Sequence, residues 1–257
     1  MLSDLVAGSV ADANERRSTR PLADVEAAAL TRPAALDVLA ALAPAERVKI
    51  IAEVKRASPS RGPLADIPDP AALAVSYETG GASAISVLTE GRKFGGSLAD
   101  LEAVREAVSI PVLRKDFIAD PYQVFEARAA GADLVLLIVA ALDDATLRSL
   151  YGLISELGMT ALVETHDADE LERALDLGAA VVGVNARNLS TFELDQDLFG
   201  RLADRIPSGV IRVAESAVMS AADVAHYRAA GADVVLVGEA LVTGGDPVTR
   251  LGEFLAV

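Results

Sequence analysis

Eight short apolar runs recur after residue 47, and they constrain the fold of this chain more than any other feature. The runs are VKIIAEV (48–54), SAISVLT (83–89), PVLRKDF (111–117), LVLLIVA (134–140), TALVETH (160–166), VVGVNAR (181–187), VIRVAES (210–216) and DVVLVGE (233–239). Most of them lack the two-residue alternation of a half-exposed strand. Near-continuous apolar strands are typical of a parallel sheet that is covered on both faces.

Segments with helical spacing separate these runs. The clearest cover residues 97–108, 122–131, 144–158, 167–178 and 220–231; Asp or Ser tends to open them and Gly tends to close them. Strands that alternate with helices over residues 48–257 predict an α/β protein with a closed (β/α)8 TIM barrel. An open doubly wound sheet is the alternative, but the loop VKRASPSRG after the first strand lacks the glycine fingerprint usual in such sheets.

We expect residues 1–47 to form an N-terminal helical extension of the same domain as the 48–257 barrel. The first 17 residues are amphipathic, and Pro21, Pro33 and Pro44 punctuate residues 18–47, which predicts two or three helices. Such an extension could close the floor of the barrel or cover its mouth as a lid. The sequence does not separate these two alternatives.

Charge and composition exclude several classes of protein. The chain has 257 residues, no cysteine and a formal net charge of -15. This excludes a disulfide scaffold and argues against a nucleic-acid or anionic-membrane partner. The longest apolar run, 134–142, is far shorter than the roughly 20 residues of a membrane-spanning helix. Because the N-terminus lacks a secretory pattern, we expect a cytoplasmic protein.

Charged and polar side chains stand at the ends of the predicted strands, where a barrel of this type carries its chemistry. They are Glu53 and Lys55 on the first strand, Arg114, Lys115 and Asp116 on the third, Glu164 and His166 on the fifth, Asn185 and Arg187 on the sixth, and Glu215 on the seventh. Buried charge is costly unless partners satisfy it, so we expect these groups to converge on one functional rim. A lysine there could act as a general acid or as a Schiff-base nucleophile, and a glutamate as a base or as a partner that orients a lysine.

A phosphate site is expected beside the loops after the seventh and eighth strands. These loops contain Glu215-Ser216-Ala217 and Gly238-Glu239-Ala240, and the first loop adds hydroxyls and a guanidinium over residues 58–62. The chain has two histidines, no cysteine ligand and no HExxH or Walker motif, so we expect no metal site.

The strings IIAEVKRASPSRG, FGGSLADLEAVR, PVLRKDFIADPYQVFEARAAGADLVLLI, LVETH, GVNARNL and VAESAV stand in this order along the chain. In these strings, and over essentially its whole length, the chain resembles the indole-3-glycerol phosphate synthases of tryptophan biosynthesis. The resemblance implies a carboxy-lyase that needs no cofactor and acts on a phosphorylated small molecule. It would close the ring of 1-(2-carboxyphenylamino)-1-deoxyribulose 5-phosphate and release carbon dioxide and water.

The resemblance also implies roles for individual residues. Lys115 would be the general acid for the ketone, Lys55 would neutralise the substrate carboxylate, Glu53 would be the dehydration base and Glu164 a second catalytic carboxylate; the division of these steps among the four stays open. Further residues would bind the substrate: Asn185, Arg187, Glu215 and Ser216 as polar contacts, and Phe94 and Phe117 as apolar faces or as core residues. The phosphate would be bound by Ser58, Ser216 and Gly238 with their neighbours Ala217 and Glu239.

Ala217 stands where the family usually has glycine. If its N–H must approach phosphate with a positive φ, alanine costs on the order of 1 kcal/mol; in an ordinary conformation it costs nothing. Two other functions stay open: a Schiff-base aldolase with Lys115 as nucleophile, and an inactive scaffold or binding variant of the same fold. The oligomeric state is not visible in the sequence; we expect a monomer, with a weak homodimer as the alternative.

Overall fold

The computed structural model describes residues 1–189 and 191–257. Within this part of the chain, eight parallel strands close into a barrel in the order β1-β10-β9-β8-β7-β6-β5-β4. They are β1 (Lys49–Val54), β4 (Ala84–Leu88), β5 (Val112–Lys115), β6 (Leu134–Ile138), β7 (Thr160–Thr165), β8 (Val181–Asn185), β9 (Ile211–Glu215) and β10 (Val234–Val237). The predicted TIM barrel is confirmed, and each of these strands lies inside its predicted run.

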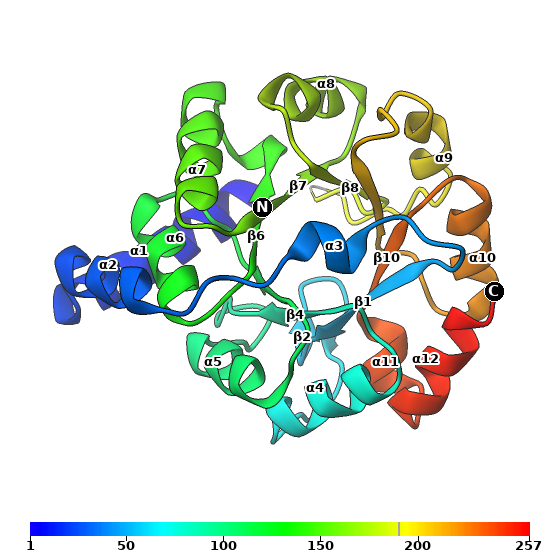
Figure 1. The fold of residues 1–257 in the computed structure, drawn as a ribbon, viewed down its shortest axis with the longest axis horizontal. Coiled ribbons are helices and arrows are strands. Elements are labelled where there is room, and N and C mark those ends of the chain that lie inside the picture. Colours follow the sequence, from blue (N-terminus) through cyan, green and yellow to red (C-terminus); the bar gives the residue numbers. More distant parts are fainter. Residues whose placement is uncertain (190) are drawn as a thin grey trace.

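Helices form a ring around the strands (Figure 1). They are α4 (Pro70–Thr79), α5 (Leu98–Ala107), α6 (Pro121–Ala129), α7 (Asp144–Glu156), α8 (Ala168–Leu177), α9 (Leu198–Ala203), α10 (Ala221–Ala229), α11 (Glu239–Thr243) and α12 (Pro247–Leu255). Side chains cap many of their N-termini, as Asp167 does by accepting the N–H of Glu170. A short 3-10 turn, η1 (Val139–Ala141), follows β6, and a small hairpin of β2 (Ala57–Ser58) and β3 (Gly62–Pro63) follows β1.

Successive residues of a barrel strand pack into two different cores, because strand side chains alternate between faces. In β5, Val112 belongs to the core between strands and helices, whereas Leu113 belongs to the core inside the barrel. The inner core also contains Leu134 and Val181, the first residues of β6 and β8. The next inward position of β5 after Leu113 is Lys115, at the end of the strand. This alternation aims Lys115 into the barrel.

The first 47 residues contain α1 (Leu2–Thr19), α2 (Leu22–Thr31) and α3 (Val38–Leu42). Val38 and Leu42 join the inner core beside residues that begin the strands, so α3 closes the floor of the barrel. Figure 1 shows α3 lying across this end of the barrel. In contrast, α1 reaches toward the opposite end, where Leu5 lines a cavity at the carboxyl ends of the strands.

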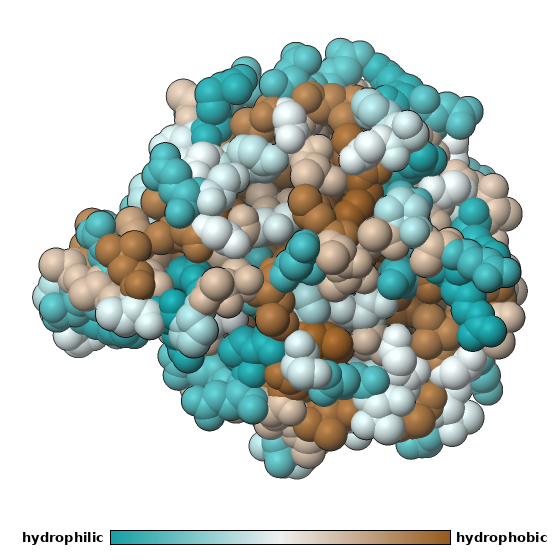
Figure 2. Space-filling model, viewed as in Figure 1, coloured by the Kyte–Doolittle hydropathy of each residue, from teal (hydrophilic) through white to brown (hydrophobic). Residues whose placement is uncertain are grey.

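Figure 2 shows hydrophilic residues over much of the rim, with apolar residues gathered near the middle of this face and over α2. Among the described residues, no helix combines the length and apolar character needed to cross a bilayer.

Candidate active site

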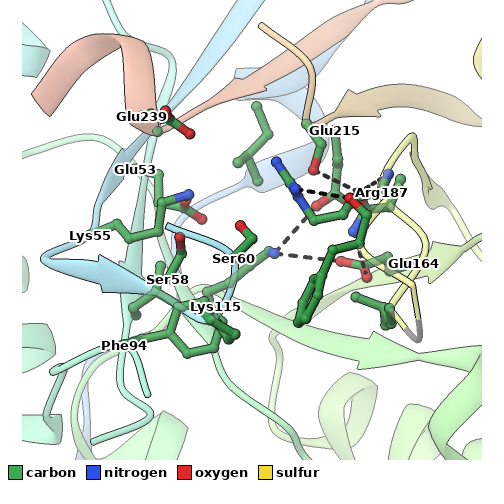
Figure 3. Close-up of a pocket in the computed structure, with 18 of the residues that line it drawn as sticks. Glu53, Lys55, Ser58, Ser60, Phe94, Lys115, Glu164, Arg187, Glu215 and Glu239 are labelled. Atoms are coloured by element: carbon green, nitrogen blue, oxygen red, sulfur yellow. Dashed lines mark hydrogen bonds and ion pairs between the residues drawn. The ribbon is translucent and has the colours of Figure 1, made fainter. Parts of the chain in front are cut away.

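A cavity of about 500 Å³ opens at the carboxyl ends of the barrel strands (Figure 3). Every residue to which the resemblance assigns a catalytic or binding role lines it: Glu53, Lys55, Ser58, Phe94, Lys115, Phe117, Glu164, Asn185, Arg187, Glu215, Ser216, Ala217, Gly238 and Glu239. Its size lies within the range of small-molecule sites. The barrel therefore brings together residues that are up to 186 positions apart in the sequence, from Glu53 to Glu239.

Lys115 lies between two buried carboxylates, as the dashed lines in Figure 3 show. Its Nζ atom is 3.5 Å from Oε2 of Glu164 on β7 and 3.4 Å from Oε2 of Glu215 on β9. Burial by itself would lower the pKa of Lys115, but the charges of Glu164, Glu215 and Glu53 outweigh burial and raise this pKa above its usual value. Lys115 is therefore positively charged at neutral pH.

The two carboxylates beside Lys115 differ in protonation. Burial would raise the pKa of Glu164, but Lys115, His166 and Asn185 together lower it well below its usual value. Burial instead raises the pKa of Glu215 to about 8, and the charge of Glu164 adds to this shift while Lys115 opposes it. Neither Glu215 oxygen accepts a hydrogen bond from a described residue. At neutral pH, Glu164 is ionised and Glu215 is mostly protonated.

Gly183 on β8 provides the space that the Glu215 side chain occupies. A Cβ atom at position 183 would overlap with Oε1 of Glu215 and would lie 3.3 Å from its Cδ atom. Only a glycine leaves the carboxylate room to face Lys115 in this position. The role of Gly183 cannot be read from the sequence, because nothing in the VVGVN run shows which side chain approaches it.

Glu53 and Lys55 form an ion pair at the end of β1. Nζ of Lys55 lies 2.7 Å from Oε2 of Glu53, whose Oε1 accepts a 3.3 Å hydrogen bond from Ser86. Burial would raise the pKa of Glu53, but Lys55 and Lys115 outweigh it and lower this pKa. Gly238 leaves room for the pair, since a Cβ there would overlap with Glu53 and lie 2.9 Å from Nζ of Lys55.

A chain of hydrogen bonds orders the polar wall formed by β8 and β9. Ser216 Oγ donates to Oδ1 of Asn185 at 2.7 Å, and Nδ2 of Asn185 donates to Oε1 of Glu164 at 3.0 Å. The backbone N–H of Arg187 also donates to Oδ1 of Asn185, at 3.0 Å. These bonds fix the amide orientation of Asn185: its nitrogen faces Glu164 on β7, and its oxygen faces Ser216 after β9.

The loop after β9 has an unusual backbone. Ser216 has a φ of 69° and Ala217 a φ of 57°, both in the left-handed region that favours glycine. Ala217 therefore has the positive φ at which alanine is strained, and this strain costs on the order of 1 kcal/mol. In the loop after β10, Gly238 precedes α11, and the Glu239 carboxylate pairs with Arg61 at 3.1 Å.

Phe94 and Phe117 face each other at the apolar side of the cavity, with ring centroids 6.1 Å apart and planes inclined by 44°. The carboxylate of Glu90 accepts the backbone N–H groups of Arg92, Lys93 and Phe94. Glu90 thereby holds the loop that carries Phe94. This role is not apparent from the sequence. Nor is that of Leu5, whose place in the cavity depends on how α1 folds back.

Arg114 lies outside the cavity, although its position at a strand end had suggested the functional rim. Its side chain is fully buried and lies 3.0 Å from Asp116 and 3.4 Å from Glu126 on α6. It also donates to the backbone carbonyl of Gln123. Arg114 belongs to the outward face of β5, so its charge joins the strand to α6 instead of serving the site.

The described residues contain no group of three or more His, Cys, Asp or Glu side chains arranged to hold a metal ion. His226, the second histidine, lies on α10 with 43% of its side chain exposed, 3.4 Å from Asp197. His166, in contrast, is buried beside Glu164.

Comparison with known proteins identifies the family. The family profile for indole-3-glycerol phosphate synthase matches residues 2–253. The chain belongs to the indole-3-glycerol phosphate synthase family. It is 74% identical to the indole-3-glycerol phosphate synthase of Leifsonia xyli over 100% of this chain and 98% of that protein. It is 60% identical to that of Mycobacteroides abscessus over 96% of this chain and 90% of that protein.

These relatives confirm the predicted indole-3-glycerol phosphate synthase, and with it the predicted carboxy-lyase of tryptophan biosynthesis acting on a phosphorylated small molecule. Solved structures of more distant enzymes share the fold. One is 3-hexulose-6-phosphate synthase from Salmonella typhimurium, with a TM-score of 0.66 and 19% identity over 81% of this chain and 97% of that one. Another is N-acetylmannosamine-6-phosphate 2-epimerase from Clostridium perfringens, with a TM-score of 0.63 and 15% identity over 86% and 96%.

Proposed function

We propose that the cavity binds 1-(2-carboxyphenylamino)-1-deoxyribulose 5-phosphate and that Lys115 protonates its ketone during ring closure. The observation that carries this proposal is the position of Lys115, buried in the cavity between Glu164 and Glu215 and held as an ammonium ion. The ring carbon bearing the substrate carboxylate attacks the ketone carbon, and the ketone oxygen takes a proton from Lys115. The developing alkoxide is a stronger base than the amine, so the proton transfer is favourable.

The following steps balance without an added reagent. The carboxylate leaves as carbon dioxide, and the electrons of its bond restore the aromatic ring. The hydroxyl formed from the ketone then leaves as water while the neighbouring carbon loses a proton. This dehydration needs one acid and one base, and the Glu53–Lys55 pair offers both at 2.7 Å from each other.

Glu53 acts as the dehydration base and Lys55 as the cation for the substrate carboxylate. The lowered pKa of Glu53 supports this assignment because it keeps the carboxylate ionised. Glu164 is the second catalytic carboxylate: because it is ionised, it takes up a proton from solvent after ring closure and passes it to the neutral amine of Lys115. Asn185, Arg187, Glu215 and Ser216 orient the substrate, and the rings of Phe94 and Phe117 pack against its aromatic ring.

Backbone N–H groups of the loops after β9 and β10 bind the phosphate, with the hydroxyl of Ser58. Ser216 Oγ already donates to Asn185, so Ser216 and Ala217 contribute through their N–H groups. Glu239 also acts through its backbone, because its carboxylate would repel phosphate and instead pairs with Arg61. Gly238 brings bare backbone to this edge of the cavity.

Residues 1–47 belong to the same domain as the 48–257 barrel and serve both of its ends. The packing of Val38 and Leu42 under the strands supports a floor role for α3. A lid role for α1 is supported by Leu5 in the cavity and by a 2.8 Å hydrogen bond from Ser9 to Asp116, the residue after Lys115. All proposed site residues come from one chain, so a cytoplasmic monomer suffices for the reaction; light scattering after gel filtration tests the monomer.

The decisive experiment follows product fluorescence after mixing the purified chain with substrate. The chain contains no tryptophan, so indole emission stands out clearly. Lys115→Met should lower kcat by about a hundred to ten thousand fold, the usual contribution of a general acid. Lys49→Met, at the opposite end of β1, is the matched control and should keep full activity. A wild-type chain without activity, and without heat of substrate binding in calorimetry, would instead support the inactive binding variant.

The charge on Lys115 also separates acid catalysis from Schiff-base chemistry. A Schiff base requires a neutral amine, and the raised pKa of Lys115 opposes that form. Treatment with borohydride in the presence of a sugar phosphate should leave the mass of the chain unchanged. A reduced adduct on Lys115 would establish the aldolase alternative.

A further inference from the structure

His166 contacts Glu164 from the side opposite Lys115. It follows β7 directly, two residues after Glu164, and only 11% of its side chain is exposed. Its Nε2 atom lies 3.1 Å from Oε1 of Glu164, and its Nδ1 atom lies 3.0 Å from Oε2 of Glu170 on α8. The imidazole is thus enclosed between two carboxylates.

Glu170 fixes the position of His166 through two contacts. Besides meeting Nδ1, its Oε2 atom accepts the backbone N–H of His166 at 2.8 Å. Glu170 itself sits in the first turn of α8, where its N–H donates to the capping Asp167. With a carboxylate oxygen about 3 Å from each ring nitrogen, the doubly protonated imidazolium is the form of His166 that these two neighbours favour.

The electrostatics agree with this geometry. Burial would lower the pKa of His166, but the carboxylates of Glu164 and Glu170, each about 3 Å from a ring nitrogen, outweigh burial and raise the pKa to about 10. Among the described residues, Glu164 on β7 and Glu170 on α8 are the charged groups that face the ring, and Asn185 on β8 is a neutral neighbour through Glu164. Lys115 and Glu215 face the far side of Glu164.

The two carboxylates beside Lys115 are therefore not equivalent. Oε1 of Glu164 is occupied by His166 and by Asn185, which leaves Oε2 for Lys115. Among the described residues, Lys115 is the charged partner of Glu215, and neither oxygen of Glu215 accepts a hydrogen bond. One ammonium cannot balance two carboxylates in a buried site, so the pair retains one proton.

We propose that His166 is a positioning residue whose imidazolium keeps Glu164 ionised and thereby places the shared proton on Glu215. This inference deepens the proposed function, because it rests on Glu164 and Lys115 acting on the substrate. Without His166, Glu164 would compete for that proton, and a protonated Glu164 would no longer accept the proton that Lys115 must recover.

Nuclear magnetic resonance tests the charge of His166 without substrate or activity. The chain has two histidines, so in the His226→Asn variant the ring signals come from His166 alone. Long-range ¹H–¹⁵N correlation should show two protonated ring nitrogens at pH 7.5. Adding Glu170→Gln should lower the pH at which the second proton is lost. A neutral ring at pH 7.5 overturns the inference even if the enzyme is fully active.

The pH dependence of kcat tests the effect on Glu164. His166→Gln keeps a polar side chain but removes the charge, so Glu164 should take up its proton at a higher pH. The deficit in kcat relative to wild type should then be larger at pH 6 than at pH 8, by up to about tenfold for each unit by which the pKa of Glu164 in the variant exceeds 6. An equal deficit at both pH values would mean a merely structural role and would refute the inference. His226→Gln is the matched control and should leave kcat unchanged at both.

The two tests keep the inference and the proposed function distinguishable. An inactive wild-type chain would reject the proposed function, while the resonance experiment would still decide whether His166 is an imidazolium. If the wild-type chain is active, His166 is charged, and the kcat deficit of His166→Gln depends on pH, the results support both the inference and the proposed function.

Discussion

Gly183→Ala should destabilise the protein through one specific contact, that with Glu215. The added methyl group would overlap with Oε1 of Glu215 and lie 3.3 Å from Leu162 Cδ1. Overpacking of this kind costs about 1–3 kcal/mol. Replacing glycine by alanine returns about 0.4–1 kcal/mol through the unfolded chain. We therefore expect a net loss of about 1–2 kcal/mol, which corresponds to a fall of roughly 2–8 °C in Tm.

A double-mutant cycle isolates the contact. In a Glu215→Ala background the carboxylate is absent, so Gly183→Ala should be neutral or stabilising by up to about 0.5 kcal/mol. Tm and the urea midpoint would be measured for the four proteins of the cycle. Gly152→Ala, where nothing lies within 4 Å of the added methyl group, is the control and should stabilise α7. Equal destabilisation by Gly183→Ala in both backgrounds would show that Glu215 is not the reason for the glycine.

Three further predictions follow from the site. Ala217→Gly should relieve the positive φ of 57°, a strain of about 1–2 kcal/mol, at a cost of about 0.4–1 kcal/mol through the more flexible unfolded chain, so the free energy of unfolding should rise by up to about 1 kcal/mol; a lower Tm would contradict the strain argument. Ser9→Ala removes the 2.8 Å hydrogen bond to buried Asp116, so α1 should be cleaved faster in limited proteolysis, and an unaltered cleavage rate would count against the anchoring role. The raised pKa of Glu215 means that its folded form binds a proton more tightly than its unfolded form, so stability is greatest below pH 4.5 and is lost as the pH rises toward 8. The free energy of unfolding of wild type, measured in urea, should therefore fall between pH 5 and pH 8 relative to that of Glu215→Gln, by at most about 1.4 kcal/mol per pH unit. If the free energies of the two proteins change with pH in parallel, this prediction is wrong.

The fold was predictable because the barrel repeats one pattern. Apolar runs mark strands buried on both faces, and the residues after each run fall on one rim whatever the sequence distance between them. Asp167 and Ser220 show that the helix starts were also readable, since each side chain accepts an N–H from the first turn. Strand ends were less readable: η1 and α11 begin inside the runs expected to be strand.

The faces of the strands were harder to predict than their ends. Arg114 and Lys115 are neighbours at one strand end, yet the first joins β5 to α6 and the second enters the cavity. The alternation of β5 decides this, because Leu113 packs inside the barrel and Lys115 shares its face. Other contributors to the site, such as Leu5 and Gly183, depend on long-range approach, which no local pattern contains.

Features that reduce stability gather at the end of β9. Glu215 is buried with a carboxyl group that accepts no hydrogen bond from a described residue, and Ser216 and Ala217 follow it with positive φ. Each departs from what packing alone favours, since an apolar residue at 215 and a glycine at 217 would cost less. All three residues lie at the cavity: Glu215 faces Lys115, and Ser216 and Ala217 line the same space. Local conflict at successive residues of one strand end is what selection for chemistry at that end would produce.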